Sequence, residues 1–393
     1  MLMLRKIDIK GYRSIKEVPA KDEPSLELRP LNLLIGANGA GKSNFISFFK
    51  MLNEMMGQRL QTYVAATGGS QALFHFGPKV TPEMEATLEF VRDTSRDWYH
   101  FRLRDAAPDQ VYFEEEELRT APQGAPGLSP VSLGSGHRET RIVGTAGALR
   151  NAQNAGRAIR FQDGFEGIVA GAVLNCLGEC RAYHFHDTTP TARMRQRFYI
   201  NDNRWLLPDA GNLAAMLYLY RQRSDVVYNR IVAALRQIMP EFDDFDLAPD
   251  RLNPSEILLN WRMRGRADYL LGPHQMSDGT LRAAAILTLL LQPKSDLPGV
   301  IILDEPELGL HPQALEMVAG LLRSASAKSQ VIVATQSQTF VDWFEPEEII
   351  TVESHEGQSR FRRLDAEHLK DWLEDYSIGE LWQRNVLGGG PLP

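Results

Sequence analysis

The stretch LNLLIGANGAGKSNF, residues 31–45, places an apolar strand, a glycine-rich loop and the start of a helix in immediate succession. Its central residues GANGAGKS, 36–43, match the pattern G-x-x-x-x-G-K-[S/T]. Glycines in such a loop let the backbone approach phosphates closely, and the loop amides and helix N-terminus supply partial positive charge. The sequence therefore predicts a phosphate-binding P-loop. A chance glycine turn is a poor alternative, because both flanking elements are present.

The P-loop pattern also assigns roles to individual side chains. Lys42 is expected to reach the β- and γ-phosphates of a nucleotide, and Ser43 is expected to bind Mg²⁺. We therefore predict ATP and Mg²⁺ as cofactors. The residues expected to contact the nucleotide are Gly36, Ala37, Asn38, Gly39, Ala40, Gly41, Lys42, Ser43 and Asn44.

A second motif, VIILDEPE (300–307), has four apolar residues followed by two carboxylates. In parallel α/β sheets, ligands bind at the carboxyl ends of the strands. Asp304 is expected to hold Mg²⁺, and Glu305 is expected to polarise the attacking water as the catalytic base. The alternative is that these two carboxylates are merely solvated at the end of a strand. The P-loop in the same chain favours the functional interpretation.

The stretch QMSDGTLR (275–282) would by itself indicate only a turn and a helix cap. Its position before the aspartate strand makes the chain resemble the ABC ATPase superfamily, and Ser277-Asp278-Gly279 is similar to the signature of the SMC, RecF and OLD branch. The resemblance implies head-to-tail dimers. In such a dimer, Ser277 and the Gly279 amide of one subunit would contact the γ-phosphate held by the P-loop of the other.

Shorter matches extend the resemblance. ELGLHP (307–312) is similar to the D-loop, and VIVATQS (331–337) to the switch region, where many relatives carry histidine and this chain has Gln336. Glutamine cannot take a proton, so Gln336 cannot act as an acid or base. Its expected catalytic contact is a hydrogen bond to the γ-phosphate. GYRS (11–14) resembles a turn that brings a basic residue, here Arg13, to the nucleotide. Gln71 is the candidate for the Q-loop metal contact, with a surface glutamine as the alternative.

The rest of the chain predicts an α/β ATPase head. Alternating apolar residues over 84–119 indicate an antiparallel β meander, a helical pattern runs from about 165 to 240, and 277–340 alternates helix and strand. The absence of sustained heptads argues against a long coiled coil. We expect an N-terminal ATPase lobe at 1–120, a loop and helical insertion at 121–250 with a loop at 121–136, and a C-terminal ATPase lobe at 251–393.

Charge and composition limit the partners. The chain has 393 residues and a net charge of −7, so a nucleic-acid surface would have to be local. The segment 181–236 carries nine arginines against four acids, which suits nucleic acid, a protein interface or a solvated face. The segment 341–375 carries eleven acids against four basic residues and suits solvent or a basic partner. Two cysteines, Cys176 and Cys180, and no apolar stretch long enough for a bilayer fit a cytoplasmic protein.

These features together predict an ATP-hydrolysing, head-to-tail dimeric ATPase. The resemblance implies a sensor or motor subunit in DNA maintenance or phage defence, acting with a separate, nuclease-like effector. An assembly scaffold that binds ATP with little hydrolysis is one alternative, and a transporter ATPase subunit is another. His184 and His186 flank Phe185 on one strand face but lack a third ligand, so we expect them to be hydrogen-bonded structural histidines.

Overall fold

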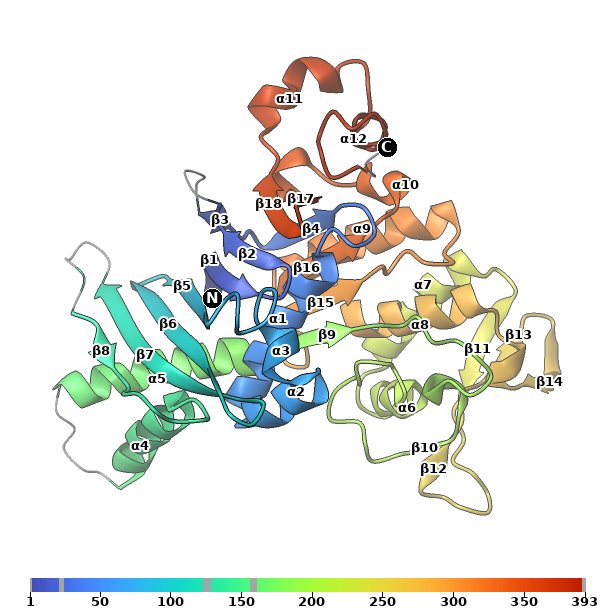
Figure 1. Cartoon of the computed structure of the whole chain (residues 1–393). Coiled ribbons are helices and arrows are strands. Elements are labelled where there is room, and N and C mark those ends of the chain that lie inside the picture. The colour runs from blue at the N-terminus through green and yellow to red at the C-terminus, as the bar shows by residue number, and fades with distance from the viewer. Residues whose placement is uncertain (1, 21–24, 123–126, 128, 156–160, 391–393) are drawn as a thin grey trace. The chain divides into compact units, whose positions relative to one another are not determined.

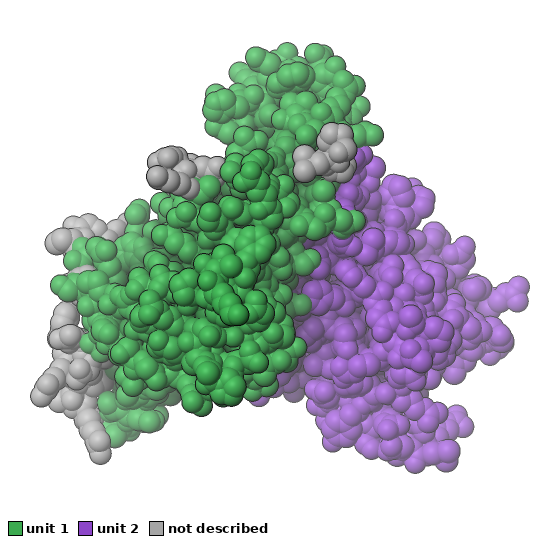
Figure 2. Space-filling view, in the orientation of Figure 1, with its two compact units in different colours: residues 1–181, 345–393 green, residues 182–344 purple. Residues whose placement is uncertain are grey.

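The computed structural model describes residues 2–20, 25–122, 127, 129–155 and 161–390. The chain packs as two units, which Figure 2 distinguishes by colour. Unit 1 consists of residues 1–181 and 345–393, and unit 2 of residues 182–344. The boundaries near 120 and 250 stay predictions of the sequence. Residues 123–126 and 128 of the expected loop at 121–136 lie outside the described residues.

Unit 1 contains a large antiparallel sheet in which the predicted meander is confirmed (Figure 1). Met84, Ala86, Leu88 and Phe90 are buried while their neighbours are not, as the two-residue period of a strand requires. In this sheet β5 pairs with β1 and β6, and β6 pairs with β7. The strands are β1 (Met3–Tyr12), β2 (Ile15–Val18), β3 (Leu26–Glu27), β5 (Glu83–Arg92), β6 (Ser95–Ala106), β7 (Gln110–Pro122) and β8 (Val131–Ser132).

A second set of strands in unit 1 carries the P-loop. The fully buried strand β4 (Leu31–Ile35) pairs in parallel with β17 (Ile349–His355), which pairs antiparallel with β18 (Gln358–Arg363). Helix α1 (Lys42–Met56) follows the loop, and the Phe45 ring packs 5.0 Å from the Phe361 ring of β18. The remaining helices of unit 1 are α2 (Leu60–Ala66), α3 (Gly69–Leu73), α4 (Ile142–Asn154), α5 (Phe161–Gly178), the short η3 (Pro346–Glu348), α11 (Ala366–Leu373) and α12 (Ile378–Gln383).

Helices α4 and α5 pack on each other, and α5 also contacts β7 and α1 (Figure 1). The Asn53 side chain of α1 donates a 2.8 Å hydrogen bond to the Gly178 carbonyl, which fixes the end of α5. At 18 residues, α5 is the longest helix in the described part of the chain, so the absence of a long coiled coil is confirmed there. The predicted α/β class, with both parallel and antiparallel strands, is confirmed as well.

Unit 2 contains the parallel pair β15 (Val300–Asp304) and β16 (Gln330–Thr335), with Val300 opposite Gln330 and Asp304 opposite Ala334. Helix α8 (Asp278–Leu290) is buried along most of its length and packs on α9 (Pro312–Ser326). No helix in the described residues is both long and apolar enough to cross a membrane. The other elements are η1 (Arg193–Arg195), β10 (Phe198–Tyr199), α6 (Leu213–Arg223), α7 (Asp225–Ile238), β11 (Phe242–Asp246), β12 (Glu256–Ile257), β13 (Asn260–Met263), β14 (Arg266–Leu271), η2 (Pro273–Gln275) and α10 (Gln338–Val341).

The helical pattern expected from 165 to 240 is only partly right. Helices α5, α6 and α7 lie in this range, but β9 (Cys180–Tyr183) interrupts them, and residues 184–212 contain only η1 and the short β10. Asn212 explains part of the difference, because its amide donates to the carbonyls of Asp202 and Trp205. These side-chain bonds hold the segment as a loop, in place of the backbone hydrogen bonds of a helix.

Candidate nucleotide-binding site

The glycine-rich loop adopts a conformation that its glycines make accessible. Gly39 and Gly41 have φ angles of 78° and 114°, a region that residues with a side chain rarely adopt. A Cβ atom at Gly41 would also lie only 1.9 Å from the Ser359 hydroxyl oxygen. Asn38, Gly39 and Ser43 are exposed. The middle of the loop and the Ser43 end of it are therefore accessible at the surface.

Lys42 begins helix α1 and is buried, and its ammonium group donates to the carbonyls of Gly36 (2.5 Å) and Ala37 (3.1 Å). The N-terminus of α1 has no side-chain cap, so the amides of its first turn can accept an anionic ligand. A positive charge and a helix N-terminus thus converge on one loop, which is the chemistry that binds phosphate groups.

The GYRS turn lies against this loop. The Ser14 hydroxyl accepts a 2.6 Å hydrogen bond from the Asn44 amide of α1 and makes a 2.7 Å bond with the Ser359 hydroxyl. Arg13 has a φ of 48°, its amide donates to Leu73, and its guanidinium lies 5.5 Å from the centre of the Tyr12 ring. The structure therefore brings the turn that carries Arg13 to the P-loop helix.

The C-terminal segment also reaches the P-loop, which the sequence did not indicate. The Gly389 carbonyl accepts a 2.9 Å hydrogen bond from the Ala37 amide, and the Gly389 amide donates to the Glu353 carboxylate at 2.8 Å. A Cβ atom at Gly389 would lie 3.3–3.6 Å from Val352, Gly36 and Ile35. The start of the phosphate loop is thus fixed by residues more than three hundred positions away in the sequence.

Gln71 lies on the exposed face of the short helix α3, with its amide against the turn at Gly77. Among the described residues, no hydrogen bond joins its side chain to the P-loop. Its assignment as a metal contact stays a prediction.

In unit 2, the two motif carboxylates stand at the end of β15. Glu305 has a φ of 46°, a strained conformation for a residue with a side chain, and its amide donates to the Ala334 carbonyl at 2.8 Å. The Gln336 side-chain amide donates to the Glu305 carboxylate. The structure therefore brings Gln336, for which the sequence predicted a contact with phosphate, into contact with Glu305.

Two histidines flank Asp304. His186 makes a 2.8 Å hydrogen bond between its Nε2 atom and the Asp304 carbonyl, and the Nδ1 atom of His184 lies 3.7 Å from the Asp304 carboxylate. The hydrogen-bonded role expected of His186 is confirmed, but its closeness to the motif aspartate was missed. No group of three or more metal-binding side chains occurs in the described part of the chain.

The Ser277-Asp278-Gly279 stretch forms the exposed start of helix α8. Ser277 caps the helix by accepting from the Thr280 amide at 3.2 Å. Gly279 lies so close to the loop after β15 that a Cβ there would be 2.3 Å from the Gly309 carbonyl oxygen. Arg282, one turn further along α8, donates to the Leu308 and Phe185 carbonyls at 3.2 and 3.1 Å. The turn Ser277–Gly279 and the segment ELGLHP, which the sequence predicts to be the signature and the D-loop, are therefore packed together.

Glu307, the first residue of ELGLHP, has a buried carboxyl group that accepts a 2.5 Å hydrogen bond from the Thr335 hydroxyl. Burial raises the pKa of Glu307 above the ordinary glutamate value of 4.5, although the Thr335 bond opposes the change. The folded chain thus binds this proton more tightly than the unfolded chain, and its stability falls as the pH rises through the raised pKa.

Replacing Glu307 with glutamine is therefore expected to raise the melting temperature at about pH 8, because glutamine has no proton to lose. The advantage should disappear below about pH 4, where glutamate is protonated in both states. Thermal unfolding across this range measures the difference between the two proteins. A difference that does not change with pH would contradict the assignment.

Several arginines of the segment 181–236 make contacts within unit 2. Arg193 pairs with Asp209 at 2.8 Å and Arg197 with Asp250 at 3.0 Å, while Arg195 is buried. A charged surface along this segment, whether for a partner or for solvent, does not include Arg195, because its side chain is buried. Replacing all three would disturb the packing as well as the surface charge.

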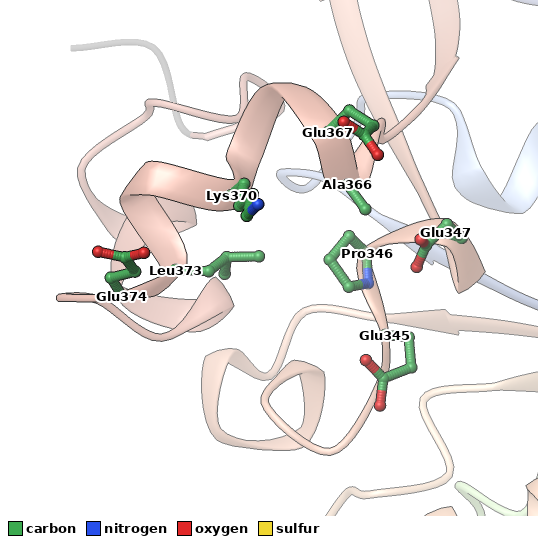
Figure 3. Close-up of a pocket in the computed structure, with 8 residues that line it drawn as sticks. All are labelled: Glu345, Pro346, Glu347, Ala366, Glu367, Lys370, Leu373 and Glu374. Carbon is green, nitrogen blue, oxygen red and sulfur yellow. The ribbon is translucent and has the colours of Figure 1, made fainter.

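A hollow of about 520 Å³ lies beside α11 in the acidic C-terminal part of unit 1 (Figure 3). Its lining consists of Glu345, Pro346, Glu347, Ala366, Glu367, Lys370, Leu373 and Glu374. Four of these side chains are carboxylates and one is a lysine, so the hollow retains the acidic character of 341–375. None of its residues belongs to a nucleotide motif.

Comparison with known proteins agrees with these observations. Residues 181–342 match the family described as "AAA domain, putative AbiEii toxin, Type IV TA system". The fold is similar to an SMC head bound to the C-terminal winged-helix domain of ScpA, with a TM-score of 0.56 and 14% identity over 94% of this chain and 99% of that one. SMC heads from Pyrococcus furiosus (TM-score 0.52, 13%) and Pyrococcus yayanosii (0.51, 12%) each cover 95% of this chain and 99% of their own. No curated protein matches the chain.

The chain thus has the fold of an SMC head, as the predicted fold class implied, and its residues 181–342 are similar to that AAA family.

Proposed function

We propose that this protein binds ATP with Mg²⁺ and hydrolyses it in a head-to-tail dimer of two copies of the chain. The observation that carries the proposal is the exposed Ser277 at the start of α8, in the same chain as a P-loop in which Asn38, Gly39 and Ser43 are exposed. A helix N-terminus on the surface can take a γ-phosphate from a second subunit. Such a contact would link nucleotide binding to closure of the dimer.

Each motif residue has a role in this proposal. The P-loop amides and Lys42 bind the phosphates, and Glu305, oriented by Gln336, polarises the attacking water. Ser43 and Asp304 offer a hydroxyl and a carboxylate oxygen, which suit Mg²⁺, and both side chains are at least partly exposed. Bound Mg²⁺ would neutralise phosphate charge. Arg13 is proposed as a further basic contact to the nucleotide.

Replacing Ser277 with arginine is expected to leave ATP binding within about twofold but to lower turnover at least about a hundredfold, since one phosphate contact is lost across the dimer. Mixing this variant with Lys42→Ala should restore activity. Half of the randomly assembled dimers would carry one intact P-loop facing one intact signature, which gives roughly a quarter of the wild-type rate. A mixture that stays inactive while Ser277→Arg still binds ATP would exclude the head-to-tail arrangement.

For the biological role, we propose a cytoplasmic sensor or motor subunit in DNA maintenance or phage defence that acts with a separate effector. The family description, which names a toxin and a type IV TA system, and the SMC head structures with bound ScpA support a search for a protein partner. Isolation of the native protein with its partners tests this role. Recovery of the chain alone, with and without ATP, would count against a stable effector.

The scaffold alternative predicts ATP binding without turnover. The partly exposed Glu305, held in a strained backbone conformation and bonded to Gln336, speaks against it. Multiple-turnover hydrolysis by the purified protein separates the two functions.

A further inference from the structure

The proposed signature contact depends on how firmly Ser277 is held. Ser277 lies between the short helix η2 (Pro273–Gln275) and the first turn of α8. The start of η2 is anchored by Trp261, whose indole nitrogen donates to the Gly272 carbonyl at 3.1 Å, and by Gln275, whose side chain accepts from the Gly272 amide at 2.9 Å. These contacts do not reach Ser277 itself.

One side chain, that of Arg195, holds both sides of Ser277. Its guanidinium donates to the Pro273 and Met276 carbonyls before Ser277, the latter at 3.1 Å, and to the Asp278 carboxylate after it, at 2.6 Å. The Nε atom donates to the Thr188 carbonyl at 2.9 Å. The residue immediately before Ser277 and the residue immediately after it are thus bonded to the same group.

The burial of Arg195 sets it apart from its neighbours. Its side chain is 5% exposed, whereas those of Arg193 and Arg197 are 55% and 58% exposed and form surface ion pairs. A guanidinium has donors in one plane and in a fixed fork, so it can bond two carbonyls and a carboxylate at once. Lysine keeps the charge but cannot reproduce this geometry, and an uncharged residue would leave buried carbonyls unpaired.

The Arg195 charge is balanced by the carboxylate of Asp278 at the start of α8. The guanidinium lies behind the N-terminus of α8, where a cation alone would be unfavourable, and Asp278 compensates for it. Because the Asp278 side chain is 62% exposed, the ion pair extends from the interior to the surface beside Ser277. The turn is therefore held from within and leaves its outer face accessible.

We propose that Arg195 is a positioning residue that fixes the turn Ser277–Gly279 in the conformation that binds the nucleotide of a second copy of the chain. This role rests on the proposed head-to-tail dimer and assigns a task to a residue outside every nucleotide motif. Loss of the guanidinium would loosen the turn without touching the P-loop, so it should weaken closure of the dimer while each subunit still binds ATP.

The test uses Arg195→Gln with Arg197→Gln as a matched control, since the control removes an exposed arginine two positions away. Binding of a fluorescent ATP analogue is measured first, and ATP turnover is then measured over a range of protein concentrations. For Arg195→Gln, we expect nucleotide affinity within about twofold of wild type and a rise of about tenfold in the protein concentration that gives half-maximal turnover. Maximal turnover should approach the wild-type value at high protein concentration.

Two further variants distinguish the loss of specific contacts from a general folding defect. Asp278→Asn breaks the same ion pair from its exposed end and should shift the concentration dependence in the same direction by a smaller factor, because the carbonyl bonds remain. Arg195→Lys keeps the charge without the fork and should fall between Arg195→Gln and wild type.

The outcomes separate this role from the dimer on which it rests. If wild-type turnover does not depend on protein concentration, and mixing Ser277→Arg with Lys42→Ala restores nothing, the dimer is excluded and the role of Arg195 with it. If both dimer tests succeed but Arg195→Gln behaves like Arg197→Gln, only the positioning role is wrong. A parallel loss of nucleotide affinity and maximal turnover in Arg195→Gln and Asp278→Asn would assign Arg195 a general structural role instead.

Discussion

Replacing Lys42 with alanine is expected to weaken ATP binding at least about a hundredfold, or roughly 3 kcal/mol, because it removes the charge that faces the phosphates. Titration of the purified variant with a fluorescent ATP analogue measures the loss. The change also removes the bonds from the ammonium group to the Gly36 and Ala37 carbonyls, so the melting temperature without nucleotide must be recorded alongside.

Lys50→Ala provides the control for Lys42→Ala, because Lys50 lies on the same helix and its loss changes the net charge equally. We expect near-normal ATP affinity for Lys50→Ala. Equal affinity of Lys42→Ala and wild type, with both proteins folded, would contradict the assignment of the P-loop.

Replacing Glu305 with glutamine is expected to preserve ATP binding and to lower turnover by a factor on the order of 10²–10⁴, the range expected for loss of a general base. The P-loop and the proposed Mg²⁺ contacts are unchanged, and glutamine keeps the size of the side chain held by Gln336. Equilibrium binding and steady-state hydrolysis, measured on one preparation, separate the two effects.

Glu316→Gln on the exposed face of α9 is a suitable control, since it makes the same chemical change away from the motifs. Hydrolysis by Glu305→Gln at the wild-type rate would assign the general base to another group.

The parts of the site that could be predicted are those encoded in contiguous sequence. The order of strand, loop and helix around the P-loop is readable because each element has its own local pattern, and the meander is readable from the alternation of Met84, Ala86 and Leu88. The same holds for Ser277, which has a capping side chain directly before an apolar helix.

The contacts that organise the site could not be predicted, because they join residues far apart in the sequence. His186 and Asp304 are 118 positions apart, and Arg195 and Asp278 are 83 apart. Local patterns carry no information about such pairs. Arg195 shows the consequence, since a run of arginines suggests a charged surface until the structure places one of them in the interior.

The segment 184–212 differs from the predicted helical pattern for a related reason. Its apolar residues Met194 and Leu206 are buried, and their spacing alone is compatible with a helix. Hydrogen bonds from the Arg195 and Asn212 side chains to backbone carbonyls hold the segment as a loop instead.

Crosslinking between two differently labelled copies tests the central claim, the head-to-tail dimer around ATP, most directly. Asn38→Cys marks the P-loop and Ser277→Cys marks the signature turn, and both positions are exposed. The native Cys176 and Cys180 are buried, and burial raises the pKa of the Cys176 thiol to about 12, so both should react slowly. Each change is made in a Glu305→Gln background that has been shown to bind ATP, and the two proteins are mixed with a short bifunctional thiol reagent.

The account predicts a covalent dimer that contains one copy of each variant, forms with ATP and Mg²⁺, and is absent without nucleotide. Each variant alone should give far less covalent dimer than the mixture, because like positions do not face each other in a head-to-tail dimer. No covalent dimer with ATP, or the same yield with and without it, would contradict the account.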